Sequence, residues 1–408
     1  MIALRVAEVI LSVLMVVAIP FVAYRKKAFT LSAAVAAVVL LAIISFAGIK
    51  TLALIVASFL ILSVVEKIIQ YKKGETVAEE ISKKTGARDL FQLGANGCAA
   101  LLCILLFFLF GNHMYLCGYT AALAEALGDS MASSIGATSR GKTINLATLK
   151  ETPPGLSGGV SIRGSVACVL SCAAIGLLSY VLELQDLYQM LIAIICGIIG
   201  CFLDSWLGAS VQVKYQCLIC GKITEKEMHC NEKTTIHSGI PYVDNDLVNV
   251  LSNMFSAALA IVLFLSLRTT TIRGVIENLL FFALFMIAAS LLHEMGHLLG
   301  CAIWKCKVLA IKLWIINYDF NNRHFSINMR GKNNCVFSTQ NKKKAKRVYL
   351  SGPCMNGILA IIGLVILFFQ PSMIIGLFAI ANVLKFICNI IPVNQTDGYM
   401  AFVALKED

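Results

Sequence analysis

Long apolar runs separated by short polar stretches make up most of this chain. A helix needs about 20 apolar residues to cross a bilayer, because each residue advances the helix by about 1.5 Å. By this measure the pattern predicts eleven membrane-crossing helices: 3–23, 29–46, 48–66, 93–110, 114–128, 164–182, 188–208, 248–267, 275–300, 348–369 and 372–391. We therefore expect an all-α polytopic membrane protein, in which the short segment 114–128 is the weakest prediction.

One polar stretch departs from the helical pattern. Between 305 and 330, apolar and polar residues alternate, first around 309–316 and again around 325–329. A period of two is typical of a β-strand with one buried face. We expect a small β element at the membrane surface, where an exposed edge strand could hold an extended peptide by strand addition. An amphipathic surface loop is the alternative.

Composition and charge support a membrane protein. Hydrophobic residues make up 58% of the 408 residues and charged residues only 14%, well below the share of about 25% in soluble domains. The net charge of +11 lies in short loops, so we interpret it as a topology signal and expect no nucleic-acid partner. The positive-inside rule places the basic loops 67–88, 129–163, 211–247 and 301–347, and the C-terminus, in the cytoplasm. The membrane we expect is a bacterial cytoplasmic membrane.

Fifteen cysteines raise the question of disulfides. Most of them lie within apolar spans, where cysteine behaves as a small hydrophobe; examples are Cys98, Cys103, Cys168, Cys172 and Cys196. We therefore expect no disulfide framework.

A second group of cysteines lies in a polar loop beside histidine. Its members are Cys217, Cys220, His229 and Cys230. Cys-x-x-Cys followed by His-Cys has a spacing compatible with a tetrahedral structural zinc site, and a reducing cytoplasm favours metal over disulfide. Because a second Cys-x-x-Cys is missing, free thiols remain the alternative.

The sharpest chemical signal lies inside an apolar span, as His-Glu-Met-Gly-His over 293–297. Residues four apart share a helix face, so His293 and His297 can bind one metal ion with Glu294 beside it. This spacing is typical of zinc-dependent peptide hydrolysis. An ionisable residue at the centre of a spanning helix costs roughly 2.5–3.5 kcal/mol on insertion scales, which pairing through a metal would offset. A structural pair of histidines is the alternative.

Two downstream motifs strengthen the protease hypothesis: Gly-Pro-Cys-Met-Asn over 352–356 and Asn-Ile-Ile-Pro-Val-Asn-Gln-Thr-Asp-Gly over 389–398. With the histidine motif they resemble the site-2 protease family of intramembrane zinc metalloproteases, over roughly 274–408. The resemblance implies that Asp397 is the third zinc ligand and that Glu294 acts as general base on membrane-embedded peptide substrates. Asn356 and Asn389 are candidates for orienting the substrate or stabilising the oxyanion.

Glycines, hydroxyl residues and carboxylates gather in the loops of the first 268 residues. Glycine lets backbone N–H groups approach an anion, and Mg²⁺ binds one or two carboxylates plus phosphate oxygens. This combination suits phosphoryl transfer with a nucleotide. The candidate phosphate and Mg²⁺ site comprises Asp129, Ser157, Gly158, Gly159, Asp204, Asp244 and Asp246. The alternative is that these glycines pack helices and the aspartates cap them.

The same loops resemble the transmembrane family that contains the plant phytyl-phosphate kinase of tocopherol synthesis. The matching pieces lie at 88–97, 128–133, 154–161, 204–205 and 244–246. The family more often has Ala-Asp-Thr-Trp-Ala where this chain has Gly-Asp-Ser-Met-Ala. The resemblance implies phosphoryl transfer from a nucleotide to a polyprenyl phosphate.

The most polar break between the two halves lies at 268–274, so we expect domains 1–268 and 274–408. The leading hypothesis is an integral membrane zinc metalloprotease fused to a polytopic domain of lipid-phosphate or nucleotide-related function. One alternative is a polyprenyl-phosphate kinase whose protease half is regulatory or degenerate. Another is a non-enzymatic membrane scaffold.

Overall fold

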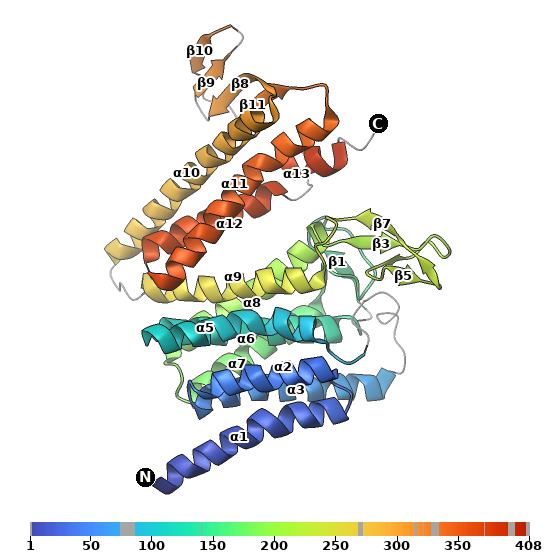
Figure 1. Cartoon of the computed structure of the whole chain (residues 1–408), viewed down its shortest axis with the longest axis vertical. Helices are drawn as coiled ribbons and strands as arrows, with labels where there is room; N and C mark the ends of the chain where they lie inside the picture. Colours follow the sequence, from blue (N-terminus) through green and yellow to red (C-terminus); the bar gives the residue numbers. More distant parts are fainter. Residues whose placement is uncertain are drawn as a thin grey trace. The chain divides into compact units, whose positions relative to one another are not determined.

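The structure is a computed structural model of the chain, and it describes residues 2–73, 86–139, 141–267, 272–313, 316–320, 322–327, 334–370, 372–390 and 396–404. In this part the chain is mostly helical, with a few short strands. It folds into two compact units, Met1–Phe264 and Leu265–Asp408 (Figure 1). The division lies a few residues before the polar break at 268–274.

The described part of the first unit contains eight long helices. They are α1 (Ile2–Arg25), α2 (Leu31–Ser45), α3 (Ile49–Lys73), α5 (Leu90–Phe110), α6 (Met114–Gly136), α7 (Ile162–Val181), α8 (Leu187–Ser210) and α9 (Asn245–Leu267). Several begin at a polar residue whose side chain accepts a first-turn N–H: Thr30, Asp89, Ser161 and Asp186. Such caps satisfy donors that the start of a helix leaves free.

Helix α6 lies at the centre of the first unit, packed against α5, α7 and α8 (Figure 1). Fifteen of its 23 residues are buried, among them Thr120 and Glu125. A helix of this length spans about 34 Å, enough to cross a hydrocarbon core of about 30 Å. The predicted segment 114–128 is therefore a single helix, and it continues to Gly136.

Short strands also occur in the first unit, where the sequence predicted only loops. β1 (Thr143–Asn145) pairs with β2 (Gly159–Ser161), β3 (Lys214–Gln216) pairs with β4 (Ile223–Thr224) and β7 (Thr235–Ser238), and β5 (Met228–His229) pairs with β6 (Glu232–Lys233). All pairs are antiparallel. These strands are too short to show a readable alternation in the sequence. The fold is mostly helical, as predicted, with small sheets in addition.

The second unit combines three long helices with one sheet. The helices are α10 (Ile272–Trp304), α11 (Lys342–Phe369) and α12 (Met373–Ile390), followed by the short α13 (Asp397–Tyr399) and a π-turn, Met400–Ala404. The antiparallel sheet has the order β10 (His324–Ile327), β9 (Ile316–Asp319), β8 (Lys307–Leu313), β11 (Asn334–Ser338). It confirms the β element predicted for 305–330; residues 314–315, 321 and 328–330 of that prediction lie outside the described residues.

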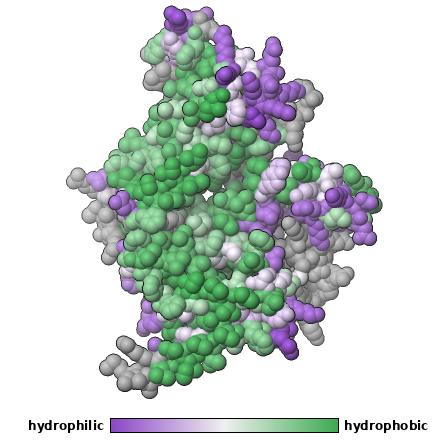
Figure 2. All heavy atoms as spheres, viewed as in Figure 1, coloured by the Kyte–Doolittle hydropathy of each residue, from purple (hydrophilic) through white to green (hydrophobic). Residues whose placement is uncertain are grey.

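All eleven predicted apolar segments form helices. In the described residues nine helices are long and apolar enough to cross a membrane, whereas α2 is shorter and α6 less apolar. Large apolar side chains such as Val9, Phe108 and Ile361 are exposed, and Figure 2 shows apolar residues covering the helical surfaces of each unit. Extensive exposed apolar surface is typical of helices that contact lipid. The protein is thus an integral membrane protein.

Candidate functional sites

Two histidines and an aspartate from distant parts of the chain meet in the second unit. His293 and His297 lie one turn apart on α10, and Asp397 begins α13. The Nε2 atoms of the two imidazoles face the same carboxylate oxygen, Oδ2 of Asp397, at 2.8 Å and 3.2 Å respectively. Both histidines are buried, with 3% and 4% of their surface exposed. The structure therefore brings together the three residues proposed as zinc ligands.

The other ring nitrogens hold the two imidazoles in place. Nδ1 of His293 lies 2.8 Å from Oδ1 of Asn356, whose amide nitrogen already donates to Asn382 and to a backbone carbonyl. Nδ1 of His297 lies 2.8 Å from the carbonyl oxygen of Val348, which can only accept. Both Nδ1 atoms therefore carry a proton, and in neutral imidazoles both Nε2 atoms present lone pairs.

Two such lone pairs and a carboxylate oxygen repel one another unless a cation lies between them. The cation is either added protons or a metal ion, and zinc accepts imidazole and carboxylate ligands at about 2.0–2.2 Å. Glu294 gives a second indication. It is 5% exposed, and its Oε2 atom has no hydrogen-bond partner among the described residues. Buried polar atoms normally have partners, so Oε2 of Glu294 has room to contact a bound reactant. The two imidazoles and the Asp397 carboxylate fit a metal ion.

Close packing between α10 and α11 determines how near the backbone comes to the imidazoles. A Cβ atom at Gly352 would lie 2.4 Å from Nε2 of His297 and 2.9 Å from Nε2 of His293. From α10, a Cβ atom at Gly296 would lie 2.7 Å from the carbonyl oxygen of Ser351. Glycine, with no Cβ atom, allows this close approach.

Of the two asparagines singled out in the sequence, Asn356 contacts His293 and is fully buried. The amide nitrogen of Asn389 donates to the carbonyl oxygen of Lys385 within α12. Residues 391–395, between Asn389 and Asp397, lie outside the described residues.

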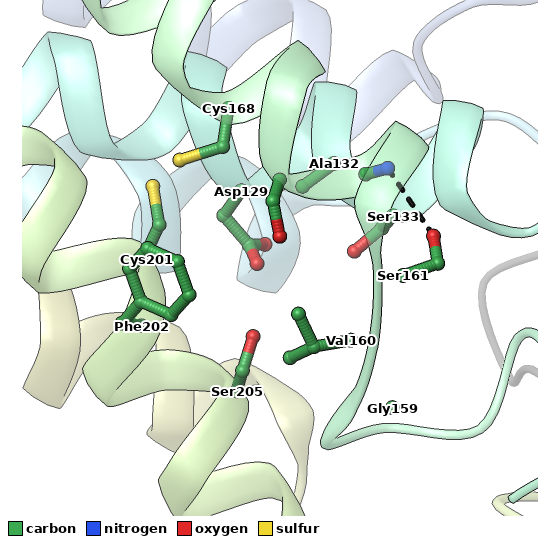
Figure 3. A pocket seen from close by; sticks show the side chains of 12 residues that line it. Asp129, Ala132, Ser133, Gly159, Val160, Ser161, Cys168, Cys201, Phe202 and Ser205 are labelled. Atoms are coloured by element: carbon green, nitrogen blue, oxygen red, sulfur yellow. Dashed lines mark hydrogen bonds between the residues drawn. The ribbon is translucent and has the colours of Figure 1, made fainter. Parts of the chain in front are cut away.

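The first unit contains a pocket between α6, α7, α8 and the loop that precedes α7 (Figure 3). Its polar lining includes the carboxylate of Asp129 and the hydroxyl of Ser205, which point into the same space from α6 and α8. At the rim, the hydroxyl oxygen of Ser161 accepts the N–H of Gly164 at 3.2 Å and caps α7. The first turn of a helix attracts anions. The pocket therefore combines a carboxylate, hydroxyls and an anion-attracting backbone.

Two residues of the predicted phosphate and Mg²⁺ site, Asp129 and Gly159, line this pocket. Ser157 and Gly158 directly precede Gly159 in the loop before α7 but do not line the pocket. The N–H of Ser157 donates to Oε1 of Glu225 at 3.0 Å.

The other three predicted carboxylates have different surroundings. Oδ2 of Asp204 accepts the hydroxyl of Ser252 at 3.0 Å, and Oδ1 of Asp244 accepts the N–H of Leu247 at 3.1 Å. Asp246 lies in the first turn of α9, where a carboxylate stabilises the helix. Within the described residues, the structure thus brings one of the four predicted carboxylates into the pocket.

The predicted cysteine–histidine group does come together. The sulfur atoms of Cys217, Cys220 and Cys230 and a ring nitrogen of His229 all lie within 4.8 Å of one another. The backbone N–H of Cys220 donates to the sulfur of Cys217 and holds the pKa of that thiol well below its usual range, at about 6. A lowered pKa favours the thiolate, which is the form that binds metals.

Two groups of residues in the first unit were not predicted from the sequence. The sulfur atoms of Cys168, Cys172 and Cys201 lie within 4.8 Å of one another. Cys168 and Cys201 line the pocket (Figure 3). We had interpreted Cys168 and Cys172 as small hydrophobes and had not singled out Cys201. Gly128 makes room for them, because a Cβ atom there would lie 2.8 Å from the sulfurs of Cys172 and Cys201. The i, i+4 spacing of Cys168 and Cys172 is visible in the sequence. That Cys201, on α8, joins them is not, because it depends on how the helices pack.

The second missed group is a buried polar face on α9. It carries Asn249, Ser252, Asn253 and Ser256, and their spacing of three or four residues was visible in the sequence. Nδ2 of Asn253 donates to Oε2 of Glu125 on α6 at 2.7 Å. A carboxylate inside the membrane-spanning part thereby has an amide partner.

Several known proteins are similar to part of this chain. Protein PGR of Arabidopsis thaliana is 26% identical over 266 residues, which cover 59% of this chain and 91% of that protein. An uncharacterised membrane protein of Methanocaldococcus jannaschii is 31% identical over 170 residues, or 41% of this chain and 68% of that protein. An uncharacterised membrane protein of Synechocystis sp. is 26% identical over 211 residues, or 51% and 71%. No solved structure matches.

A family model, integral membrane protein DUF92, matches residues 14–257. The matched range contains the pocket and the cysteine–histidine group, and it ends before α10. Because this range covers more than half of the chain, the protein belongs to the DUF92 family of integral membrane proteins.

Proposed function

We propose that the second unit is a zinc-dependent intramembrane endopeptidase of the site-2 protease kind. One observation carries the proposal: Nε2 of His293 and Nε2 of His297 converge on one oxygen of Asp397. These three residues would hold the metal, with Asn356 positioning His293 through Nδ1. Bound zinc supplies Lewis acidity and makes water nucleophilic at neutral pH.

Glu294 is the general base in this proposal. Its carboxylate follows His293 directly on α10, is buried, and has an Oε2 atom without a partner among the described residues. It accepts a proton from the attacking water and passes it to the leaving amine. Because the carboxylate is buried, bulk water is excluded from it, and the attacking water is the one that it would contact.

The substrate class is a membrane-embedded peptide. A helical substrate hides its peptide bonds in backbone hydrogen bonds, so it must be extended before cleavage. In the sheet order, β10 and β11 are the edge strands, and an unpaired strand edge can hold an extended peptide.

The test uses the full protein in liposomes with a fluorescently tagged single-span peptide. Glu294→Gln should keep its zinc and lower cleavage about 10²–10⁴-fold, because a general base contributes that much. Glu277→Gln, an exposed position on the same helix, is the matched control and should cleave as wild type does. Full cleavage by Glu294→Gln would show that this carboxylate is not the base.

A second function, phosphoryl transfer from a nucleotide to a polyprenyl phosphate, has its own supporting observation. The pocket of the first unit places the Asp129 carboxylate beside hydroxyls and the N-terminus of α7. One carboxylate with phosphate oxygens is sufficient to hold Mg²⁺.

Equilibrium binding of ATP and CTP with Mg²⁺ tests this second function. Asp129→Asn should lose Mg²⁺-dependent binding. Asp186→Asn is the control, since Asp186 caps α8 and asparagine caps equally well. Wild-type protein without affinity for either nucleotide at millimolar concentration would end this proposal.

For both sites we propose a cytoplasmic location, based on the basic loops. Single cysteines at Lys343 and Lys150 should resist an impermeant maleimide in intact cells and react after permeabilisation. Lys50 pairs with Glu183 at 2.8 Å on the predicted outer side. A single cysteine in place of Lys50 should react both in intact cells and after permeabilisation. Labelling of Lys343 in intact cells would contradict the assignment.

A further inference from the structure

The cysteine–histidine group of the first unit has the geometry of a metal site. Nδ1 of His229 lies 3.4 Å from the sulfur of Cys220 and 3.3 Å from that of Cys230. Tetrahedral zinc with Zn–S of about 2.3 Å and Zn–N of about 2.0–2.1 Å has N···S separations of about 3.5 Å. A hydrogen bond accounts for only one of the two contacts, because Nδ1 has one proton or one lone pair.

Two tight turns bring the ligands together. Between β3 and β4, Gly221 has φ +71° and its N–H donates to the carbonyl oxygen of Cys217. Between β5 and β6, Cys230 and Asn231 have φ of 53° and 61°. Such angles suit glycine and asparagine but are uncommon for cysteine. The turn therefore holds Cys230 in a conformation that its side chain does not favour, and ligation would offset that strain.

The β3–β4 hairpin leads directly to a clamp on the loop before α7. Glu225 follows β4 and accepts the N–H of Ser157 on Oε1 at 3.0 Å. Gln212, which precedes β3, donates through Nε2 to the hydroxyl oxygen of Ser157 at 3.1 Å. Both clamp residues are buried. Burial lowers the pKa of Lys214 on β3, and the Glu225 carboxylate offsets part of that shift, so charge also favours this arrangement.

The clamped loop forms one rim of the pocket. A Cβ atom at Gly158 would lie 2.3 Å from the backbone of Ala209, so the loop rests on the end of α8. The residues that follow, Gly159 to Ser161, line the pocket with Asp129 (Figure 3). A continuous set of contacts therefore joins the cysteine–histidine group to the pocket.

We propose that Cys217, Cys220, His229 and Cys230 bind one structural zinc ion, and that this ion holds the hairpin from which Glu225 supports the pocket rim. Three thiolates and one imidazole are a usual structural zinc set, whereas Mg²⁺ and Ca²⁺ take oxygen ligands. Binding releases the thiol protons to solvent. The proposal holds whatever the pocket binds and whether or not the second unit cleaves peptides.

The metal is tested in full-length protein carrying His297→Ala, which removes a ligand of the other site. Zinc analysis should give one equivalent, and Cys220→Ser or Cys230→Ser should lower it to near zero. Cys388→Ser, an exposed cysteine on α12, is the control and should keep the equivalent. Cobalt(II) in place of zinc should give a sulfur-to-metal charge-transfer absorbance in the parent and the control. One equivalent retained by Cys220→Ser, or no such absorbance in the parent, would overturn the proposal.

Hydrogen exchange tests the link to the pocket. Stripping zinc with a chelator should increase exchange in the peptide that contains Ser157, and Glu225→Ala should do the same while zinc stays bound. Peptides of the β8–β11 sheet should not change and serve as the internal control. Unchanged exchange at Ser157 after zinc removal would leave a metal site without the proposed support role and would refute that part.

Discussion

The two proposed metal sites of this protein are built in opposite ways. In the second unit, His293 and Asp397 are 104 residues apart and packed helices hold them. In the first, all four proposed ligands lie between 217 and 230, on strands of two or three residues and the turns that join them. Cys220 and Cys230 are exposed, whereas His293 and His297 are buried.

The difference is between a site that is formed before the ion binds and a site that folds as the ion binds. Packed helices and the Nδ1 contacts orient the histidines before any ion arrives, which is the arrangement that catalysis requires. Short hairpins bury little apolar surface, so ion binding and local folding are coupled. Three substitutions test this contrast. Their expected effects range from loss of one zinc ion to a small change in zinc affinity.

The largest effect is expected at Gly352. In Gly352→Ala the new Cβ atom would meet Nε2 of both histidines, so zinc content should fall by one equivalent while the thiolate–cobalt absorbance of the first unit stays unchanged. Gly357→Ala is the control on the same helix, because its Cβ atom meets only the edge of the Phe386 ring at 3.2 Å. Wild-type zinc content in Gly352→Ala would contradict the proposed position of the ion.

An intermediate effect is expected at Asn356. Asn356→Ala removes the acceptor for Nδ1 of His293, and loss of such a partner weakens metal binding about 10–100-fold. Competition with a chelating dye, in a Cys220→Ser background, measures the change. Asn356→Asp keeps an acceptor and should recover much of the affinity. Equal affinity in the alanine variant would mean that helix packing alone orients the ring.

The smallest effect is expected at Gly221. A Cβ atom there meets nothing within 4 Å, but φ is +71°, so alanine adds only backbone strain of about 1 kcal/mol. Zinc affinity of the cysteine–histidine group should fall about fivefold in the His297→Ala background. Gly221→Asn should bind almost as wild type does, because asparagine tolerates this conformation. A much larger loss with asparagine would show that space, not strain, limits the turn.

The helices could be predicted from the sequence because a bilayer leaves few other ways for a single segment to satisfy its backbone. The ends of the helices were less predictable. The predicted segment stops at 128, before the polar Asp129, yet the helix continues to Gly136 and Asp129 lines a pocket. The short strands of the first unit depend on pairing between separate loops, which no local pattern records.

The site residues show the same difference: groups placed by one helix could be predicted, and groups placed by packing between distant segments could not. His293, Glu294 and His297 are four residues apart at most, so one helix is sufficient to place them together. The gathering of Asp204 and Asp244 around Asp129 was predicted from residue type alone, and the structure does not bring them to the pocket. Asp244 caps α9 instead, as the capping alternative anticipated.

Helix α6 has a consequence for how the protein is made. A segment that enters the bilayer alone exposes its polar groups to lipid, at about 3 kcal/mol for each carboxylate near its centre. Glu125 finds its amide partner on α9, and α7 and α8 cover the same helix, yet all three are synthesised later. We expect α6 to wait at the translocon until its successors arrive, so that a chain truncated before α7 leaves 114–136 outside the membrane in a protease-protection assay. Biogenesis of the first unit would then be cooperative, with late helices completing the insertion of an early one.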